Sequence, residues 1–117
     1  MTFHDDTQAL LPLPSATFHI LIAVSPEPRH GYAIIQDVAE RTGGQLKIQA
    51  GTLYRSIQRM LEQGLVAEVR GADDADDERR RYYRLTAFGR AVAQAEARRL
   101  AQMVKLARAA GFSPGRA

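Results

Sequence analysis

Two arginines one helical turn apart, Arg55 and Arg59, are the residues best suited to chemistry with another molecule. An arginine side chain can donate two parallel hydrogen bonds to guanine O6 and N7, or clamp a phosphate group. Gly51 and Thr52 precede them in the first turn, where small side chains and free N–H groups favour the close approach of a phosphate. These residue types in this order predict a helix that contacts DNA. An ordinary solvated helix face is the alternative interpretation of the same charges.

The helix that carries these arginines is predicted over residues 50–64. Its apolar residues fall at positions i, i+4, i+7 and i+8, and they are Leu53, Ile57, Met60 and Leu61. At about 100° per residue these positions make one apolar stripe, which must face a core. The opposite face is polar and basic, with Tyr54 at its border.

The composition permits a nucleic-acid partner without establishing one. The chain has 117 residues, no cysteine and a net charge of +3, and 14 of its 16 basic residues are arginine. This length suits one domain that buries roughly two-thirds of its unfolded surface. The absence of cysteine excludes disulfides, thiolate metal sites and a cysteine nucleophile. Because no apolar run approaches about 18 residues and no signal-peptide pattern is present, we expect a cytoplasmic protein with no membrane partner.

The chain before residue 50 predicts an arm, two helices and a short strand. An irregular N-terminal arm is expected over residues 1–14. Ser15 can cap a first helix over residues 16–24, which is apolar nearly all round and therefore needs cover on every side. Two glycines stop a second helix over residues 30–42. The alternating run 45–48 predicts a small strand.

The chain after residue 64 predicts a hairpin and a long helix. The segments 65–70 and 80–85 have strand composition and flank a long acidic loop. Thr86 can cap a last helix over residues 87–110, which at 1.5 Å per residue is roughly 36 Å long. Such a helix is longer than a small domain can cover. Residues 111–117 are expected to form a flexible tail.

Two helices with uncovered apolar residues predict a second copy of the chain as partner. We expect the first and last helices to pair across a two-fold axis. The expected dimerisation residues are Ile20, Leu21, Val24, Val92, Leu100, Met103, Val104 and Ala107. In the alternative arrangement, the last helix folds back over its own domain.

Three helices followed by a β-hairpin make a winged helix-turn-helix, and four ordered segments resemble the signature of PadR-like transcriptional regulators. The segments are His-Gly-Tyr-Ala-Ile at 30–34, Gly-Thr-Leu-Tyr at 51–54 with Arg59, Glu-Gln-Gly-Leu at 62–65, and Tyr-Tyr-Arg-Leu-Thr-Ala-Phe-Gly at 82–89. The resemblance covers about residues 15–110. The fold is then mainly α with a small β-hairpin: a winged helix-turn-helix domain over 15–86 and a C-terminal dimerisation helix over 87–110. The short length and single C-terminal helix are similar to the smaller branch of the family.

The resemblance implies a homodimeric bacterial regulator, usually a repressor, that binds double-stranded DNA at a pseudo-palindromic operator. It leaves room for a small-molecule effector of unknown identity. By position it implies that Tyr32 lies near a backbone phosphate and that Tyr54 matches a tyrosine that touches DNA. The alternative for Tyr32 is a core tyrosine with its hydroxyl at the surface, and the alternative for Tyr54 is packing beside Leu53. One of the two α-helical arginines would take a base edge and the other a phosphate. The expected DNA-binding residues are Tyr32, Lys47, Gln49, Gly51, Thr52, Tyr54, Arg55, Arg59, Arg79, Arg80 and Arg81.

The loop of the hairpin departs from the glycine-rich, basic tip that many wings carry. Residues 73–78 have a net charge of −5 and residues 79–84 have +4. Carboxylates held against phosphates repel them, so we expect the basic base of the wing to contact DNA while the acidic tip bends away or pairs with the arginines. A different class of function stays open, namely a winged-helix protein interaction module that uses the acidic wing as its contact surface.

The sequence predicts neither an enzyme nor a metal or cofactor site. His4, His19 and His30 lie in the arm, an apolar helix and a helix start, without the spacing of a triad or a metal site. The acidic loop lacks the glycine and the closing glutamate of an EF-hand. There is also no glycine-rich phosphate loop.

Overall fold

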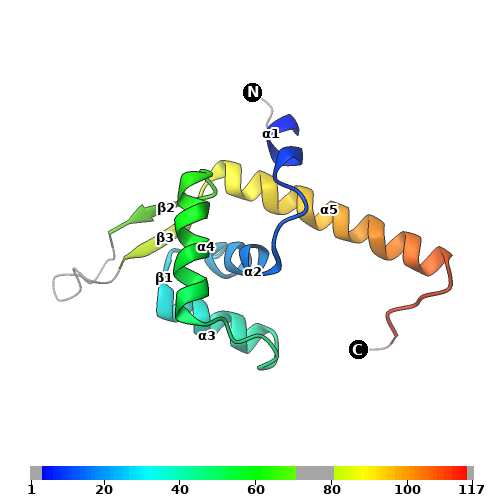
Figure 1. Cartoon of the computed structure of the whole chain (residues 1–117), viewed down its shortest axis with the longest axis horizontal. Coiled ribbons are helices and arrows are strands. Elements are labelled where there is room, and N and C mark those ends of the chain that lie inside the picture. Colours follow the sequence, from blue (N-terminus) through cyan, green and yellow to red (C-terminus); the bar gives the residue numbers. More distant parts are fainter. Residues whose placement is uncertain (1–3, 71–80, 116–117) are drawn as a thin grey trace.

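The computed structural model describes residues 4–70 and 81–115. Its elements, in order, are α1 (His4–Ala9), α2 (Ser15–Val24), β1 (Arg29–His30), α3 (Gly31–Arg41), α4 (Ala50–Glu62), β2 (Val66–Val69), β3 (Tyr82–Leu85) and α5 (Ala87–Ala109). Figure 1 shows α2, α3 and α4 gathered beside the small sheet, while α5 extends away from them. The predicted fold class, mainly helical with a small antiparallel sheet and a long C-terminal helix, is confirmed.

The sheet is antiparallel, with its strands in the order β1-β3-β2. β2 and β3 pair as the predicted hairpin, with Val66 opposite Leu85. β1 was not predicted, since the sequence places a helix start at its second residue. It consists of two residues that pair with β3, and Arg29 lies opposite Tyr83. This short strand ties the start of α3 to the hairpin.

The predicted strand over residues 45–48 is wrong, because this run has no regular secondary structure. Its alternation comes from side chains that pack inward without a neighbouring strand. Ile48 is buried in the core, and Leu46 packs against it. The segment therefore serves as the linker that leads from α3 into α4.

One hydrophobic core joins α2, α3, α4, the sheet and the first half of α5. Its largest fully buried side chains are Ile20, Leu21, Val24, Ile34, Val38, Leu53, Ile57, Met60, Leu65 and Val92. α2 contacts α3, α4, α5 and β3, so a helix that is apolar nearly all round is covered by its own chain. The expectation that Ile20, Leu21, Val24 and Val92 lie at a dimer interface is therefore wrong, because the monomer already buries them.

The N-terminal arm, expected to be irregular, contains the six-residue helix α1, which packs against α5. The buried carboxylate of Glu96 on α5 faces the backbone of Leu13, between α1 and α2. It accepts hydrogen bonds from Arg99 Nε at 2.7 Å and from Arg99 Nη2 at 2.9 Å. The hydrogen bond from Arg99 lowers the pKa of Glu96, and the backbone of Leu13 adds a smaller effect in the same direction. Burial alone would raise this pKa.

Hydrogen bonds and close backbone packing fix the start of α5 to the end of α4. Gly64, at φ 78°, ends α4, and the Leu65 N–H donates to the Met60 carbonyl at 2.9 Å. Thr86 caps α5, because its Oγ1 accepts from the Gly89 N–H at 2.8 Å and donates to the Gly64 carbonyl at 2.6 Å. A Cβ atom at Gly89 would overlap the Leu65 carbonyl oxygen. Only glycine allows this close approach, so the two helices hold a fixed relative position.

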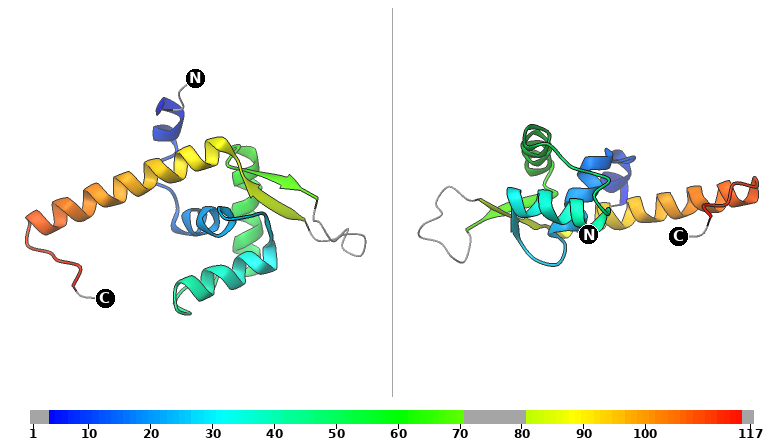
Figure 2. Two further views of the ribbon diagram at one scale, coloured as in Figure 1. Left: turned by 180° about the vertical axis from the view of Figure 1, so that it is seen from behind. Right: turned by 90° about the horizontal axis from the view of Figure 1, so that it is seen from below.

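The second half of α5 stands clear of the rest of the chain in both views of Figure 2. Four apolar side chains there are between 38% and 54% exposed, namely Leu100, Met103, Val104 and Leu106. Beyond α5 the chain has no regular secondary structure as far as residue 115. Within the described ranges, no helix is long and apolar enough to cross a membrane.

Candidate nucleic-acid interface

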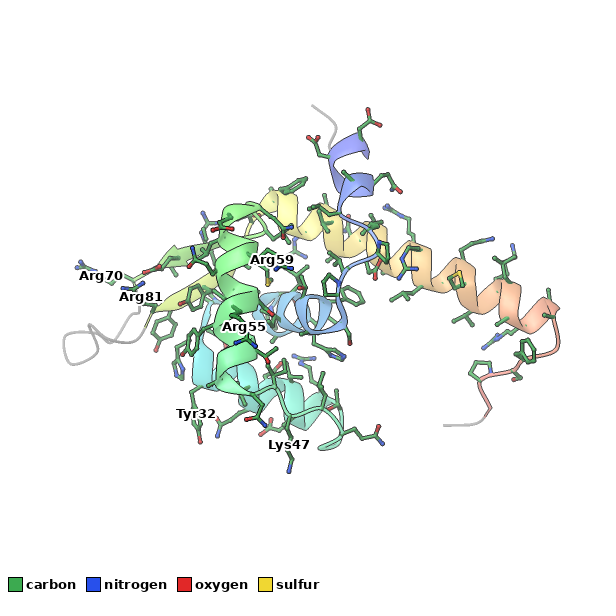
Figure 3. All side chains as sticks on the ribbon, in the orientation of Figure 1. Tyr32, Lys47, Arg55, Arg59, Arg70 and Arg81 are labelled. Carbon is green, nitrogen blue, oxygen red and sulfur yellow. The ribbon has the colours of Figure 1, made fainter. Side chains whose placement is uncertain are left out.

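The helix α4 has the two faces that its sequence predicts. On the inner face, Leu53, Ile57 and Met60 are at most 2% exposed. The outward side chains are exposed, and they are Tyr54, Arg55, Gln58, Arg59 and Glu62. Figure 3 shows Arg55 and Arg59 following one another along α4, with Lys47 and Tyr32 near its first turn. The structure therefore brings together predicted site residues from α3, α4 and the linker between them.

The first turn of α4 is open to a ligand. Gln49 precedes the helix, and its side chain makes no hydrogen bond to the N–H groups of the first turn. Such groups, at the positive end of a helix dipole, favour an anion. Arg55 Nη2 lies 3.4 Å from Thr52 Oγ1, which places its guanidinium over this turn. Gly51 adds no side chain that would keep a phosphate at a distance.

The charges of Arg55 and Arg59 are not neutralised by a salt bridge anywhere in the described part of the chain. Other arginines are paired: Arg41 Nε lies 2.6 Å from an Asp37 carboxylate oxygen, and Arg99 is bound to Glu96. Within the described residues the arginines of α4 therefore remain available to an external anion, whereas Arg41 and Arg99 each pair with a carboxylate on their own helix.

Two exposed tyrosines lie at the edge of this face. Tyr32 is 64% exposed and Tyr54 is 51% exposed, so neither side chain belongs to the buried core. Both line a pocket of about 410 Å³, together with Gln58 of α4 and with His30, Glu68, Arg81 and Tyr83 of the sheet region. Burial raises the pKa of Tyr83, and the charges of Glu68 and Tyr54 add to the effect. The pocket joins the outward face of α4 to the start of α3 and the base of the wing.

At the base of the wing, where the structure describes residues up to 70 and from 81 onward, one side chain was predicted to bind DNA and two further charged side chains were not predicted. Arg81 is exposed, and its Nε lies 3.7 Å from Glu68 Oε2. Glu68, on β2, and Arg70, directly after it, were missed, although both are exposed and alternate with less exposed neighbours. Figure 3 shows Arg70 and Arg81 at the end of the sheet that leads into the wing.

The remaining wing predictions lie outside the described residues. They concern Arg79, Arg80, the acidic run 73–78, and the interaction module that would use this run as its surface.

The helix pair α3 and α4 is followed by the β2–β3 hairpin, and this arrangement defines a winged helix protein. The outward face of α4 is basic. Residues 20–95 match the sequence model of the transcriptional regulator PadR-like family. This chain belongs to that family. An uncharacterized protein of Lysinibacillus sphaericus is 39% identical to it over 72 residues, which are 62% of this chain. The chain spans 65% of the length of that relative.

Solved structures share the fold. A PadR family transcription regulator from Clostridium difficile superimposes with a TM-score of 0.71 at 22% identity, over 81% of this chain and 96% of the other. Bacillus subtilis PadR, in complex with operator DNA, gives a TM-score of 0.60 at 18% identity, over 74% of this chain and 47% of that one. At these identities the similarity establishes the winged helix fold.

Proposed function

We propose that this chain is a homodimeric repressor that binds a pseudo-palindromic operator through the outward face of α4. The observation that carries the proposal is the exposure of Arg55 and Arg59, which form no salt bridge within residues 4–70 and 81–115, beside a helix start where the side chain of Gln49 makes no capping hydrogen bond. The presence of operator DNA in the Bacillus subtilis PadR structure supports it.

The proposed DNA contacts are of two kinds, to base edges and to backbone phosphates. Of Arg55 and Arg59, one takes a base edge in the major groove and the other a phosphate. The small residues of the first turn, Gly51 and Thr52, let the helix approach the groove with its N-terminus first. Tyr54 adds a contact at the edge of the same face. The flanking phosphate contacts are assigned to Tyr32, Lys47, Gln49, Arg79, Arg80 and Arg81.

A second copy of the chain is proposed to cover the projecting half of α5. Four of the expected dimerisation residues lie there, and they are Leu100, Met103, Val104 and Ala107. Because the α4–α5 junction is fixed, the dimer would set the separation of the two α4 helices, with about 34 Å between half-sites in successive major grooves. A small-molecule effector that changed this geometry would release the DNA. We place this activity in the cytoplasm of a bacterial cell.

A fluorescence anisotropy titration tests the proposal. The protein is titrated into a labelled duplex from the region upstream of its own gene and into a scrambled duplex of the same composition. The upstream duplex is expected to bind more tightly, and its affinity is expected to fall steeply between about 50 and 200 mM salt because bound cations are released from DNA. Equal affinity for both duplexes at both salt concentrations would contradict an operator-binding function.

A further inference from the structure

Gly31, the first residue of α3, is buried under the side chain of Tyr54 from α4. A Cβ atom at Gly31 would lie 2.8 Å from Tyr54 Cζ and closer still to the Tyr54 hydroxyl oxygen. It would also lie 3.1 Å from Leu53 Cδ2. Because real Cβ atoms essentially never come within 3.0 Å of another heavy atom, any other residue here would displace the tyrosine ring.

Backbone conformation does not explain the glycine. Gly31 is not among the glycines with positive φ, which are Gly43, Gly44, Gly64, Gly111 and Gly115. An alanine could adopt the same backbone, and it has a higher helix propensity. Space for Tyr54 is therefore the property that glycine supplies at this position.

The ring of Tyr54 reaches from α4 across the start of α3. It is only half exposed, and it borders the pocket of about 410 Å³ that also contains Tyr32, Glu68 and Arg81. The start of α3 is itself well fixed, because β1 pairs with β3 and because His30 Nδ1 accepts a hydrogen bond from the Ala33 N–H at 3.2 Å. The ring therefore rests against a rigid seat on one side and faces open space on the other.

We propose that Gly31 is a positioning residue for DNA binding, which seats the Tyr54 ring against α3 and holds its exposed edge beside Tyr32 for contact with the DNA backbone. The proposal rests on the proposed function of the α4 face. A side chain at Gly31 would push the ring into the open pocket, so the DNA-binding surface would change while the core beneath it stays packed.

A double-mutant cycle on the full chain tests the proposal with Gly31→Ala, Tyr54→Ala and the combined variant. Gly31→Ala alone is expected to weaken binding to the upstream duplex about tenfold, which is a typical coupling between contacting residues. In the Tyr54→Ala background the same substitution is expected to change affinity less than about twofold, because the displaced ring is absent. Equal losses in both backgrounds would overturn the proposal. Loss of the cooperative thermal transition in Gly31→Ala would also overturn it, in favour of a purely structural role.

A second measurement reports on the ring without DNA. With 3-fluorotyrosine incorporated, the ¹⁹F signals of Tyr32, Tyr54, Tyr82 and Tyr83 can be assigned through single Tyr→Phe variants. Gly31→Ala is expected to shift the Tyr54 signal most, and a Tyr54 signal that does not move would overturn the proposal. If the wild-type protein shows no preference for its upstream duplex, the proposed function fails and the DNA role of Gly31 with it. The ¹⁹F result then still decides whether Gly31 seats the ring.

Discussion

The helices α4 and α5 are both amphipathic, but the rest of the chain buries the apolar face of α4 and only part of the apolar face of α5. In α4 the apolar face is closed within the chain, since Leu53 and Met60 are fully buried. In α5 the face is covered only at first: Val92 is fully buried, whereas Met103, about three turns further on, is 53% exposed. α4 therefore leaves a polar face exposed, while the far half of α5 leaves an apolar face exposed.

The junction at Thr86 and Gly89 connects these two surfaces. The hydrogen bonds from Thr86 to the carbonyls of Gly64 and Leu65, just after α4, leave α5 little freedom to turn relative to the outward face of α4. A partner that binds the far half of α5 would thereby set the position of α4.

The largest effect is expected at the closed face of α4. Leu53→Ala should lower the free energy of unfolding by about 2–5 kcal/mol, because it leaves a cavity in the core. Leu106→Ala, on the projecting half of α5, is the matched control and should change it by less than about 0.5 kcal/mol in the monomer. Urea unfolding at low protein concentration measures both values. Similar losses of unfolding free energy in the two variants would contradict the difference in burial between Leu53 and Leu106.

The exposed apolar face in the second half of α5 is tested by measuring whether the protein dimerises through it. Leu100→Asp with Met103→Asp should convert a dimer into a monomer of 12.9 kDa, because charges at an apolar interface are costly to bury. Arg98→Asp with Lys105→Asp places two carboxylates on other faces of the same helix, and this control should remain dimeric. Sedimentation velocity distinguishes the two masses. A dimer in the first variant would exclude pairing through this face.

A smaller effect is expected at Glu96, where the covered part of α5 ends. Its pKa is lowered in the folded chain, so its ionised form stabilises the fold above the ordinary value of 4.5. This stabilisation is lost as the pH falls from about 4.5 through the lower folded pKa.

Glu96→Gln should therefore lower Tm by a few degrees at pH 7, and its Tm should fall less than that of the wild type on acidification below pH 4.5. Thermal unfolding followed by circular dichroism from pH 7 to pH 3 measures this difference, using intervals of about half a pH unit. Parallel curves for the two proteins would show that the Glu96–Arg99 contact does not affect stability.

The sequence predicted α4 and its two faces correctly because a helical period repeated over several turns is a strong local signal. It missed β1, whose two residues are too few to alternate and whose pairing depends on β3, distant in the sequence. It also missed α1, a six-residue helix whose support comes from packing on α5. Short elements depend on tertiary contacts more than on local pattern.

The error about α2 has a related cause. Its composition shows that all sides of the helix need cover, but it does not show whether the chain or a partner supplies that cover. The structure shows that α3, α4, α5 and β3 supply it. In the same way, the sequence predicted Tyr54 as a site residue but did not predict its contact with Gly31, because that contact joins two separate helices.

The central claim, that the outward face of α4 binds DNA, is tested most directly by removing its charge. Anisotropy titrations on the upstream duplex would compare the wild type with Arg55→Ala plus Arg59→Ala, and with Arg90→Ala plus Arg98→Ala, which removes the same charge from α5. We expect the α4 variant to lose roughly 100-fold in affinity, because each arginine contact contributes about 1–3 kcal/mol. The α5 variant should lose far less. Wild-type affinity in the α4 variant, or equal losses in both, would contradict the account.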